Sequence, residues 1–412
     1  MQANRKIYKL DGVIQHYNWG GDRFLRELIN TADAGDPPYA EYWMGAHDNA
    51  PSIISTSNNS SYRLNEFVAS DKKEILGHAV SEKFGRLPFL FKVLDVKDML
   101  SIQVHPSKKA AEFGFSEENR NNIALNSPTR NFKDDNHKPE LMLALSQFWL
   151  LHGFKPTEQL RNILSTIPEL GFLLPVFDRG SYEGLYRTIM EITQSEVNER
   201  LQSLIERITP LYEAGSLQRT SEDFWAARAY QTFCSNDRID RGLFSIYFFN
   251  LVHLQPGDAI FQDAGILHAY LEGQNLELMA NSDNVLRGGL TNKHIDVPEL
   301  LKHVSFVPVY PSIIRGIATD TPGEQRFLTI AEDFELRELK IFPNQETRLT
   351  SNTLEIFLVY QGELQVTTGD DDVLQLKRGE SMMSICDAEL VMRSTAGAIC
   401  YRATLPQPTK GE

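Results

Sequence analysis

Two residues that could bind a metal ion stand two positions apart in the stretch LSIQVHPSKK, which covers residues 100–109. Read as a β-strand, this stretch sends its apolar residues to one face and Gln103 and His105 to the other, because side chains alternate along a strand. The apolar face is expected to pack against a core. The opposite face carries an amide and an imidazole, which can both coordinate a metal ion.

Two later segments repeat this pattern, with polar residues at alternate positions of an apolar strand. In DDNHKPELML, residues 134–143, the side chains of Lys138 and Glu140 share one face. In GILHAYLEG, His268 and Tyr270 share a face in the same way. If the three strands line one small barrel, their polar faces converge in its interior.

Polar groups inside a barrel need partners, because burying them unpaired costs free energy. Two histidines, one glutamate and one glutamine around a divalent metal ion would satisfy one another. Two neutral imidazoles and a carboxylate suit Zn²⁺, at metal–ligand distances of about 2.0–2.2 Å, whereas glutamine is an unusual zinc ligand. The alternative is that each histidine is a structural residue with an ordinary hydrogen bond, and the pattern alone leaves both interpretations open.

The elements that would position these residues divide into β-rich and helical parts. Strand-like runs dominate residues 1–155, and one of them, LPFLFKVLDV, suits a strand that is buried on both faces. Over residues 156–242, apolar residues recur at three- and four-residue spacing, which predicts helices that begin near Thr157, Ser195 and Ser221. We therefore expect an inserted α-helical domain between two β-rich parts.

Strands are expected to resume at Leu243, where Pro-Gly and Ala-Gly turns separate short apolar runs. Such spacing is typical of an antiparallel barrel or jelly roll. Residues 243–320 are expected to complete the first β domain, and residues 321–412 to form a second one. The second β domain has no histidine, since the last histidine in the chain is His303, so we expect it to be structural and not catalytic.

Composition and charge exclude several classes of protein. With 412 residues the chain is too long for one simple core. A net charge of −14 without a long basic run argues against nucleic acid or a membrane surface as partner. Three cysteines far apart in the sequence predict neither a disulfide framework nor a thiolate zinc site. Without a signal-peptide core or a run of roughly 18 apolar residues, we expect a cytoplasmic protein.

The motifs resemble those of type I mannose-6-phosphate isomerase (phosphomannose isomerase), a zinc-dependent family of the cupin superfamily. The resemblance is carried by LSIQVHPSK, DDNHKPELML and LHAYLEG with NSDNVLRGGLT, and by YNWGG, EYWMGAH, LPFLFKVL and HGFKP, within roughly residues 10–300. It implies a mainly β fold with inserted helices. In that fold a cupin jelly-roll catalytic domain and an inserted α-helical domain are followed by a second, metal-free cupin-like β domain at the C-terminus.

The resemblance also implies a reaction and a set of site residues. The reaction is the reversible isomerisation of mannose 6-phosphate and fructose 6-phosphate through a cis-enediol, which needs a base, a stabiliser of enediolate charge and a phosphate anchor. One Zn²⁺ per chain would be held by Gln103, His105, Glu140 and His268. The catalytic candidates are Arg287, Lys138, Asp283 and His137. The substrate-binding candidates are Ser101, Lys92, Tyr270, Lys293 and Trp19.

Several of these residues have an ordinary structural alternative. Asp283 could simply stabilise a turn in NSDN, and Trp19 could pack in the core. Lys92 lies in an apolar run where an unpaired charge is costly, so its partner could be an acidic side chain instead of a phosphate. Lys138 could pair only with one of the two aspartates at the start of its segment.

Two other functions compete with the isomerase, namely a cupin metal-dependent oxygenase that holds iron and a non-catalytic sugar-phosphate-binding cupin. The absence of an HxH cluster argues against the first, and the presence of Lys138 argues against both. For the isomerase we expect a monomer that binds small sugar phosphates and neither nucleic acid nor membrane. Whether its flux runs from mannose or toward GDP-mannose is left open by the sequence.

Overall fold

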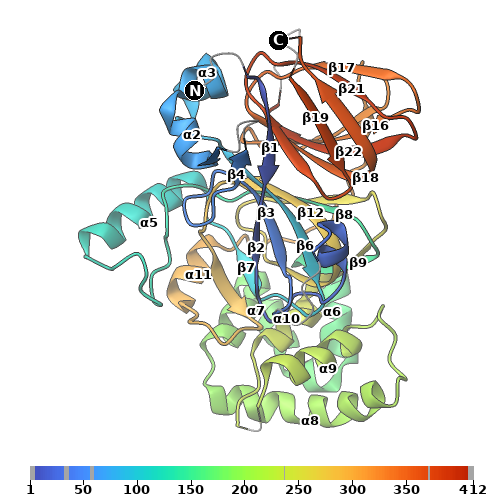
Figure 1. Cartoon of the computed structure of the whole chain (residues 1–412). Helices are drawn as coiled ribbons and strands as arrows, with labels where there is room; N and C mark the ends of the chain where they lie inside the picture. Colours follow the sequence, from blue (N-terminus) through green and yellow to red (C-terminus); the bar gives the residue numbers. More distant parts are fainter. Residues whose placement is uncertain (1–4, 32–36, 56–59, 236, 370–371, 407–412) are drawn as a thin grey trace.

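The computed structural model describes residues 5–31, 37–55, 60–235, 237–369 and 372–406, whose strands form two large antiparallel sheets (Figure 1). One sheet has ten strands and makes up the middle of the molecule in this view. Its strands are β2 (Val13–Gln15), β3 (Glu41–Gly45), β6 (Phe89–Val96), β7 (Ile102–Val104), β8 (Glu140–Ala144), β9 (Phe148–Phe154), β10 (Phe249–Leu254), β11 (Ala259–Gln262), β12 (His268–Ala280) and β13 (Leu286–Gly289).

The long strand β12 organises the ten-stranded sheet, because it pairs with β6, β7, β8 and β9. His268 of β12 stands directly opposite Gln103 of β7, and Gln103 in turn stands opposite Arg287 of β13. Directly opposed residues of antiparallel strands point to the same face of a sheet. The register therefore gathers these three polar side chains from three separate strands.

The strand β6 is buried at every position, as predicted for a strand covered on both faces. Its neighbours in the sheet are β3 and β12. Helices are inserted between the strands, so the predicted class, mainly β with inserted helices, is confirmed. The helices outside the insert are α1 (Phe24–Leu28), α2 (Leu64–Ser70), α3 (Lys72–Leu76), α4 (His78–Lys83), α5 (Lys108–Arg120) and α11 (Val297–His303).

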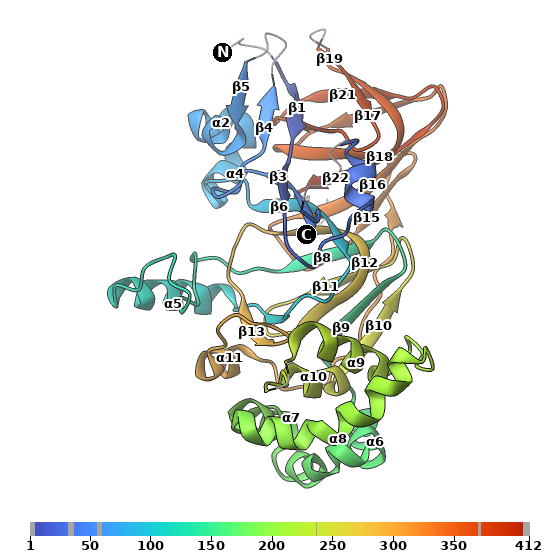
Figure 2. The same cartoon turned by 60° about the horizontal axis from the view of Figure 1, so that its bottom comes forward.

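The inserted helices gather at one end of the ten-stranded sheet, the lower end in Figure 2. They are α6 (Thr157–Thr166), the 3₁₀ helix η1 (Pro168–Leu173), α7 (Leu174–Glu191), α8 (Gln194–Glu213), α9 (Glu222–Phe233) and α10 (Gly242–Phe248). Ser221 caps α9 as predicted, whereas the start predicted at Ser195 is wrong by two positions. Thr193 caps α8 instead, in a capping box with Glu196. No helix of the described residues is long and apolar enough to cross a membrane.

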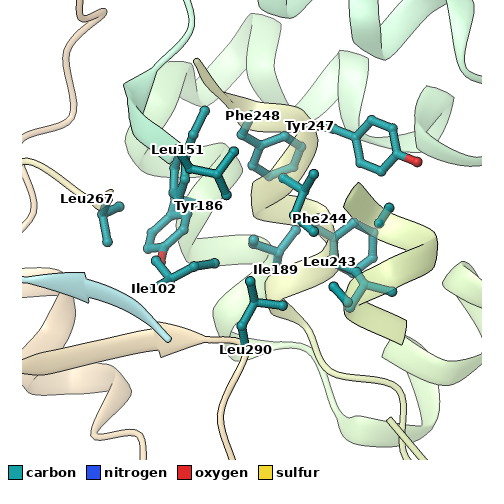
Figure 3. Close-up of a cluster of buried hydrophobic side chains, with 14 of the residues drawn as sticks. Ile102, Leu151, Tyr186, Ile189, Leu243, Phe244, Tyr247, Phe248, Leu267 and Leu290 are labelled. Carbon is teal, nitrogen blue, oxygen red and sulfur yellow. The ribbon is translucent and has the colours of Figure 1, made fainter. Parts of the chain in front are cut away.

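The start of the stretch predicted as a strand from Leu243 is helical, because α10 precedes β10. Every residue of α10 is buried, so the run is apolar on all sides and its periodicity does not distinguish a helix from a strand. Figure 3 shows how α10 packs between α7 and the sheet. The labelled side chains of this core are Leu243, Phe244, Tyr247 and Phe248 of α10, Tyr186 and Ile189 of α7, and Ile102, Leu151, Leu267 and Leu290.

The second sheet has twelve strands and includes the beginning of the chain. Its strands are β1 (Ile7–Asp11), β4 (Ile53–Ser55), β5 (Ser61–Arg63), β14 (Ile317–Ala318), β15 (Glu324–Phe327), β16 (Glu335–Ile341), β17 (Glu346–Thr350), β18 (Glu355–Thr367), β19 (Val373–Lys377), β20 (Ser381–Ser384), β21 (Glu389–Arg393) and β22 (Ala398–Thr404). Because β1 pairs with β20, the first strand of the chain belongs to the C-terminal sheet.

A network of buried charges lies within the C-terminal sheet. Arg402 of β22 donates to Glu355 at 2.7 Å and to Glu324 at 2.9 Å. Arg337 of β16 donates to Glu324 at 3.0 Å and to Glu335 at 2.6 Å. Buried charges of opposite sign in such contact satisfy one another, so this network is part of the core of the second β domain.

Candidate metal centre

Three side chains that could coordinate a metal ion meet inside the ten-stranded sheet. They are His105, which directly follows β7, and Glu140 and His268, the first residues of β8 and β12. Their ligand atoms all lie within 4.8 Å of one another. The Nε2 atom of each histidine is 3.4 Å from an oxygen of Glu140. All three residues are buried, so the ends of three strands converge on one enclosed point.

Backbone carbonyl groups fix the orientation of both imidazole rings. Nδ1 of His105 donates to the carbonyl of Asn284 at 2.8 Å, and Nδ1 of His268 donates to the carbonyl of Ile266 at 2.9 Å. A ring that donates from Nδ1 has Nε2 as its metal-binding atom. Nε2 of His105 is buried and has no hydrogen-bond partner among the described residues, and coordination of a metal ion would satisfy it.

The protonation states at this point suit a divalent cation. Burial lowers the pKa of His105 to about 4, so its ring is neutral at pH 7. Burial alone would raise the pKa of Glu140, but the nearby Lys138 and His105 outweigh it and hold that pKa well below its usual range. A neutral imidazole and an ionised carboxylate are the forms in which these side chains bind metal ions.

Gln103 lies beside this cluster and completes a set of four possible ligands. Its amide nitrogen donates to Oγ of Ser101 at 3.4 Å, which leaves the amide oxygen available as a ligand. Gln103, Glu140 and His268 line the same cavity. A zinc ion can be coordinated by this set of two imidazole nitrogens, one carboxylate and one amide oxygen.

Lys138 lines the same cavity and contacts the candidate ligands directly. Its Nζ atom is 2.8 Å from an oxygen of Glu140, so the described partner of Lys138 is neither Asp134 nor Asp135. Lys138 is also buried. A buried positive charge beside Glu140 keeps this carboxylate ionised and places an ammonium group next to the point where the ligands converge.

Lys92 is engaged by two carboxylates that the sequence reasoning did not select. Its Nζ atom lies 3.0 Å from Glu277 and 3.6 Å from Glu41. Burial alone would lower the pKa of Lys92, but these carboxylates outweigh it and raise the pKa above its usual range. The hydroxyl of Tyr270 donates to Glu277 at 2.9 Å. A carboxylate within an apolar strand, such as Glu277 in NLELMA, is the sequence signal that could have identified these partners.

Asp283 lies at a second, larger cavity of about 610 Å³, which His47, Asn49 and Lys133 also line. Oδ1 of Asp283 is 3.2 Å from Nε2 of His47, and Asn49 donates to its Oδ2 at 3.2 Å. Burial would raise the pKa of Asp283, but the hydrogen bond with His47 outweighs it, so the pKa is lowered. The backbone N–H of Asp283 donates to Asp134 at 2.7 Å, which fixes its loop.

Arg287 and Lys293 are cations that have no acidic partner among the residues that the structure describes. Burial lowers the pKa of Arg287, and burial together with the charge of Arg287 lowers the pKa of Lys293. Burial and neighbouring cations, Arg287 among them, also lower the pKa of Lys133. Positive charges held together in this way favour an anionic ligand.

Two of the predicted site residues lie apart from the convergence of ligands. Nε2 of His137 is 2.9 Å from Oδ2 of Asp333, and both line a separate cavity of about 460 Å³. Trp19 stacks on Tyr17, with ring centroids 5.6 Å apart, and packs against the hydrophobic cluster that contains Tyr270. The structure therefore brings His137 to the C-terminal β domain, whereas Trp19 is partly buried beside the hydrophobic cluster.

We expect His137→Ala to reduce stability more than it reduces catalysis. The substitution leaves the buried carboxylate of Asp333 without its partner, which costs about 1–3 kcal/mol. Thermal unfolding should therefore shift to lower temperature, whereas kcat/KM for mannose 6-phosphate, measured well below that temperature, should stay close to wild type. A large loss of kcat/KM with unchanged thermal unfolding would instead assign His137 to the reaction.

Comparisons with known proteins identify the family. The family model described as the catalytic domain of type I phosphomannose isomerase matches residues 7–157. The mannose-6-phosphate isomerase of Salmonella typhimurium is 36% identical over 399 residues, which are 95% of this chain and 98% of that protein. The chain belongs to the type I phosphomannose isomerase family. The human mannose-6-phosphate isomerase is 33% identical and aligns with 92% of this chain and 93% of its own length.

Solved structures of the family agree with the fold as a whole. A crystal structure of a mutant phosphomannose isomerase from Salmonella typhimurium has a TM-score of 0.88 at 33% identity and covers 98% of this chain and 100% of that one. A zinc-bound mannose 6-phosphate isomerase has a TM-score of 0.86 and covers 97% of this chain and 100% of that one. The predicted family, cupin fold and isomerase class are confirmed, and the similarity extends beyond residue 300 into the second β domain.

Proposed function

We propose that this mannose-6-phosphate isomerase carries out its reaction where His105, Glu140 and His268 converge. The observation that supports this assignment is the convergence itself, in which two oriented imidazoles and an ionised carboxylate share one buried point. The direct test is turnover of mannose 6-phosphate to fructose 6-phosphate by the purified chain. Absence of turnover in protein shown to contain zinc would contradict the proposal.

In this proposal one Zn²⁺ per chain is held by Gln103, His105, Glu140 and His268. Bound there, zinc supplies a Lewis acid that polarises the oxygen atoms of the sugar. The chain's own contribution is to keep His105 neutral, the carboxylate of Glu140 ionised and both imidazole rings fixed by backbone carbonyls. These conditions lower the cost of assembling the site when zinc binds.

The proton transfer between C1 and C2 is assigned to Lys138 and Asp283. Lys138 is held at the candidate ligands by its contact with Glu140. Asp283 has a lowered pKa, so it is ionised at pH 7 and can accept a proton. Tyr270, Ser101 and Lys92 line the cavity beside the ligands and shape the space for the sugar. His137 and Trp19 are assigned supporting roles in packing.

The anchor for the phosphate group is assigned to Arg287 and Lys293. Both lack an acidic partner among the described residues, whereas the charge of Lys92 is already matched by Glu277 and Glu41. A cation without a partner gains most from a new anion, because no existing ion pair has to be broken. This contrast is why the phosphate is assigned to Arg287 and Lys293.

Removing the charge of Arg287 is expected to weaken recognition of the phosphate. A charge-assisted hydrogen bond contributes about 1.5–3 kcal/mol, so Arg287→Met should reduce kcat/KM for mannose 6-phosphate by about 10- to 150-fold. Inorganic phosphate should also inhibit the variant more weakly than the wild type. Arg315→Met is a matched control, because Arg315 is an exposed arginine paired with Asp258. Equal kcat/KM values for Arg287→Met and the wild type would contradict the assignment.

The oligomeric state, the partners, the cellular compartment and the domain boundaries are also proposals. The group formed by His105, Glu140 and His268 needs no residue of a second copy, and we propose a monomer whose partners are small sugar phosphates and neither nucleic acid nor membrane. The three cysteines form no disulfide, which supports a reducing compartment such as the cytoplasm. We also propose the division into catalytic domain (1–155 and 243–320), helical insert (156–242) and second β domain (321–412), in which β1, β4 and β5 of the first part join the sheet of the second β domain. A sedimentation measurement that gives a dimer mass would contradict the monomer.

A further inference from the structure

The strand β13, which carries Arg287, is attached to the helical insert at its C-terminal end. We propose that the insert positions Arg287 through the carboxylate of Asp240, which makes Asp240 a positioning residue for the isomerase reaction. This inference rests on the proposed role of Arg287 in binding the anionic substrate. It gives the helical insert, which contributes no candidate ligand or catalytic side chain, a defined part in the site.

The Asp240 carboxylate accepts hydrogen bonds from backbone groups on both sides of the junction. It accepts from the N–H of Gly242, at the start of α10, at 2.7 Å. It also accepts from the N–H of Leu290 at 2.8 Å and of Thr291 at 3.3 Å, directly after β13. Asp240 is 1% exposed, so water does not compete for these contacts. A carboxylate that holds several backbone N–H groups is a strong anchor.

The insert holds Asp240 in turn through the residue on either side of it. Asn198 of α8 accepts a hydrogen bond from the N–H of Ile239 at 2.9 Å, and Gln194 donates to the carbonyl of Ile239 at 2.8 Å. Arg241 donates to the carbonyl of Met190 in α7. The position of Asp240 is therefore set by the helices of the insert.

The backbone after Arg287 approaches the insert so closely that glycine is required. A Cβ atom on Gly289 would lie 2.5 Å from Cα of Gly242, and one on Gly288 would lie 2.4 Å from the hydroxyl of Tyr186 in α7. Leu290 has a φ of 51°, a conformation that costs energy for a leucine. The hydrogen bond from Leu290 to Asp240 helps to hold this strained conformation in place.

Arg287 stands three residues before Leu290 and directly opposite Gln103, a candidate metal ligand. The hydrogen bonds at Leu290 and Thr291 therefore fix one end of β13. The Arg287 side chain of this short strand must contact the substrate next to the metal centre. If Asp240 no longer holds that end, β13 can shift, and a displacement of about 1 Å at a reacting group can reduce the rate roughly 100-fold.

The test uses the full-length, zinc-loaded protein and the variant Asp240→Asn, whose neutral amide has one accepting oxygen in place of two and therefore cannot accept from the N–H groups of Gly242, Leu290 and Thr291 together. We expect kcat/KM for mannose 6-phosphate to fall about 10- to 100-fold, with inhibition by inorganic phosphate weakened in parallel. Hydrogen exchange of the peptide that contains Leu290 and Thr291 should become faster, while zinc content stays at the wild-type value. Asn198→Ala, which removes the acceptor for the N–H of Ile239 together with the contacts of Asn198 to Asp237 and Gln194, should produce the same changes to a smaller extent.

The control is Asp223→Asn, which removes another carboxylate of the insert, the one that accepts from Tyr247 and Arg207. Equal loss of kcat/KM in Asp223→Asn and Asp240→Asn at matched thermal stability would overturn the proposal, since the effect would then be general destabilisation. So would unchanged exchange at Leu290 together with wild-type kinetics in Asp240→Asn.

A double-mutant cycle separates this proposal from the assignment of Arg287 itself. If Asp240 acts through Arg287, Asp240→Asn should add little loss to the Arg287→Met protein, because the group that it positions is already gone. Fully additive losses would overturn the positioning role while leaving the assignment of Arg287 intact. A near-wild-type Arg287→Met protein would instead remove the assignment on which the proposal depends.

Discussion

Glu140→Ala is expected to abolish zinc retention and isomerase activity together. The substitution removes the carboxylate that, among the described residues, groups with His105 and His268 as a possible ligand, and with it the partner of Lys138. Loss of a group that merely supports a metal ligand typically costs 10- to 100-fold in affinity, so loss of the anionic ligand itself should exceed about 100-fold. Metal content after dialysis against a zinc buffer and turnover of mannose 6-phosphate are the measurements.

Thermal stability provides a second readout of zinc binding that does not depend on activity. A ligand that binds only the folded state raises its stability, so added zinc should raise the unfolding temperature of metal-free wild-type protein but not of Glu140→Ala. Glu355→Ala is the matched control, since it removes an equally buried carboxylate from the C-terminal sheet. That variant should unfold at lower temperature and still respond to zinc. Full activity in wild-type protein stripped of metal would refute the zinc requirement.

The second large effect is expected at Lys138, where Lys138→Met should reduce kcat by at least about 100-fold. The substitution removes the ammonium group 2.8 Å from Glu140, next to the proposed site of proton transfer. Lys138→Arg distinguishes two roles, because arginine keeps the positive charge but does not readily give up a proton. If Lys138 stabilises enediolate charge, the arginine variant should keep part of its activity. If Lys138 transfers the proton, both variants should be inactive.

Exchange of the transferred hydrogen with solvent provides the independent measurement for Lys138. A proton-transfer role predicts that Lys138→Met and Lys138→Arg lose hydrogen exchange at C2 and isomerisation to the same degree. Zinc content should be measured in both variants, because Lys138 also holds Glu140 in its ionised form. Lys155→Met is a suitable control, since it removes another buried lysine that pairs with a carboxylate, Glu222, away from the candidate ligands. Near-wild-type rates in zinc-loaded Lys138→Met would leave Lys138 with only a pairing role.

The candidate ligands could be predicted from the sequence because each depends on a local rule. Alternation along a strand places Gln103 and His105 on one face, and the same rule applies to Lys138 with Glu140. The placement of these strands in one barrel concerns segments far apart in the sequence, so no local rule predicts it. That placement is supported by the family resemblance. In the structure, β12 pairs with β7 and His268 stands opposite Gln103, so these two strands do lie side by side.

The features that sequence reasoning missed are tertiary in origin. The run from Leu243 is apolar on every side because it is enclosed between α7 and the sheet, and an enclosed run carries no periodicity that would reveal a helix. The partners of Lys92 lie on β3 and β12, so they could be assigned only once the strand order was known. The carboxylate of Asp240 accepts from the backbone N–H of Leu290, a residue 50 positions later, and a backbone partner leaves no mark on side-chain type.

The pairing of β1 with β20 determines when, during synthesis of the chain, β1 can gain one of its neighbouring strands. Leu10 accepts a hydrogen bond from Ser381, a residue 371 positions later, so the strand made first obtains one of its neighbours nearly last. At about 5–20 residues per second, the ribosome needs roughly 20–75 s to bridge that interval. During this time β1 has an unpaired edge toward its missing neighbour, which is the kind of edge that chaperones protect and that aggregation exploits. Synthesis of this enzyme is therefore expected to depend on chaperones more strongly than its refolding from the complete chain.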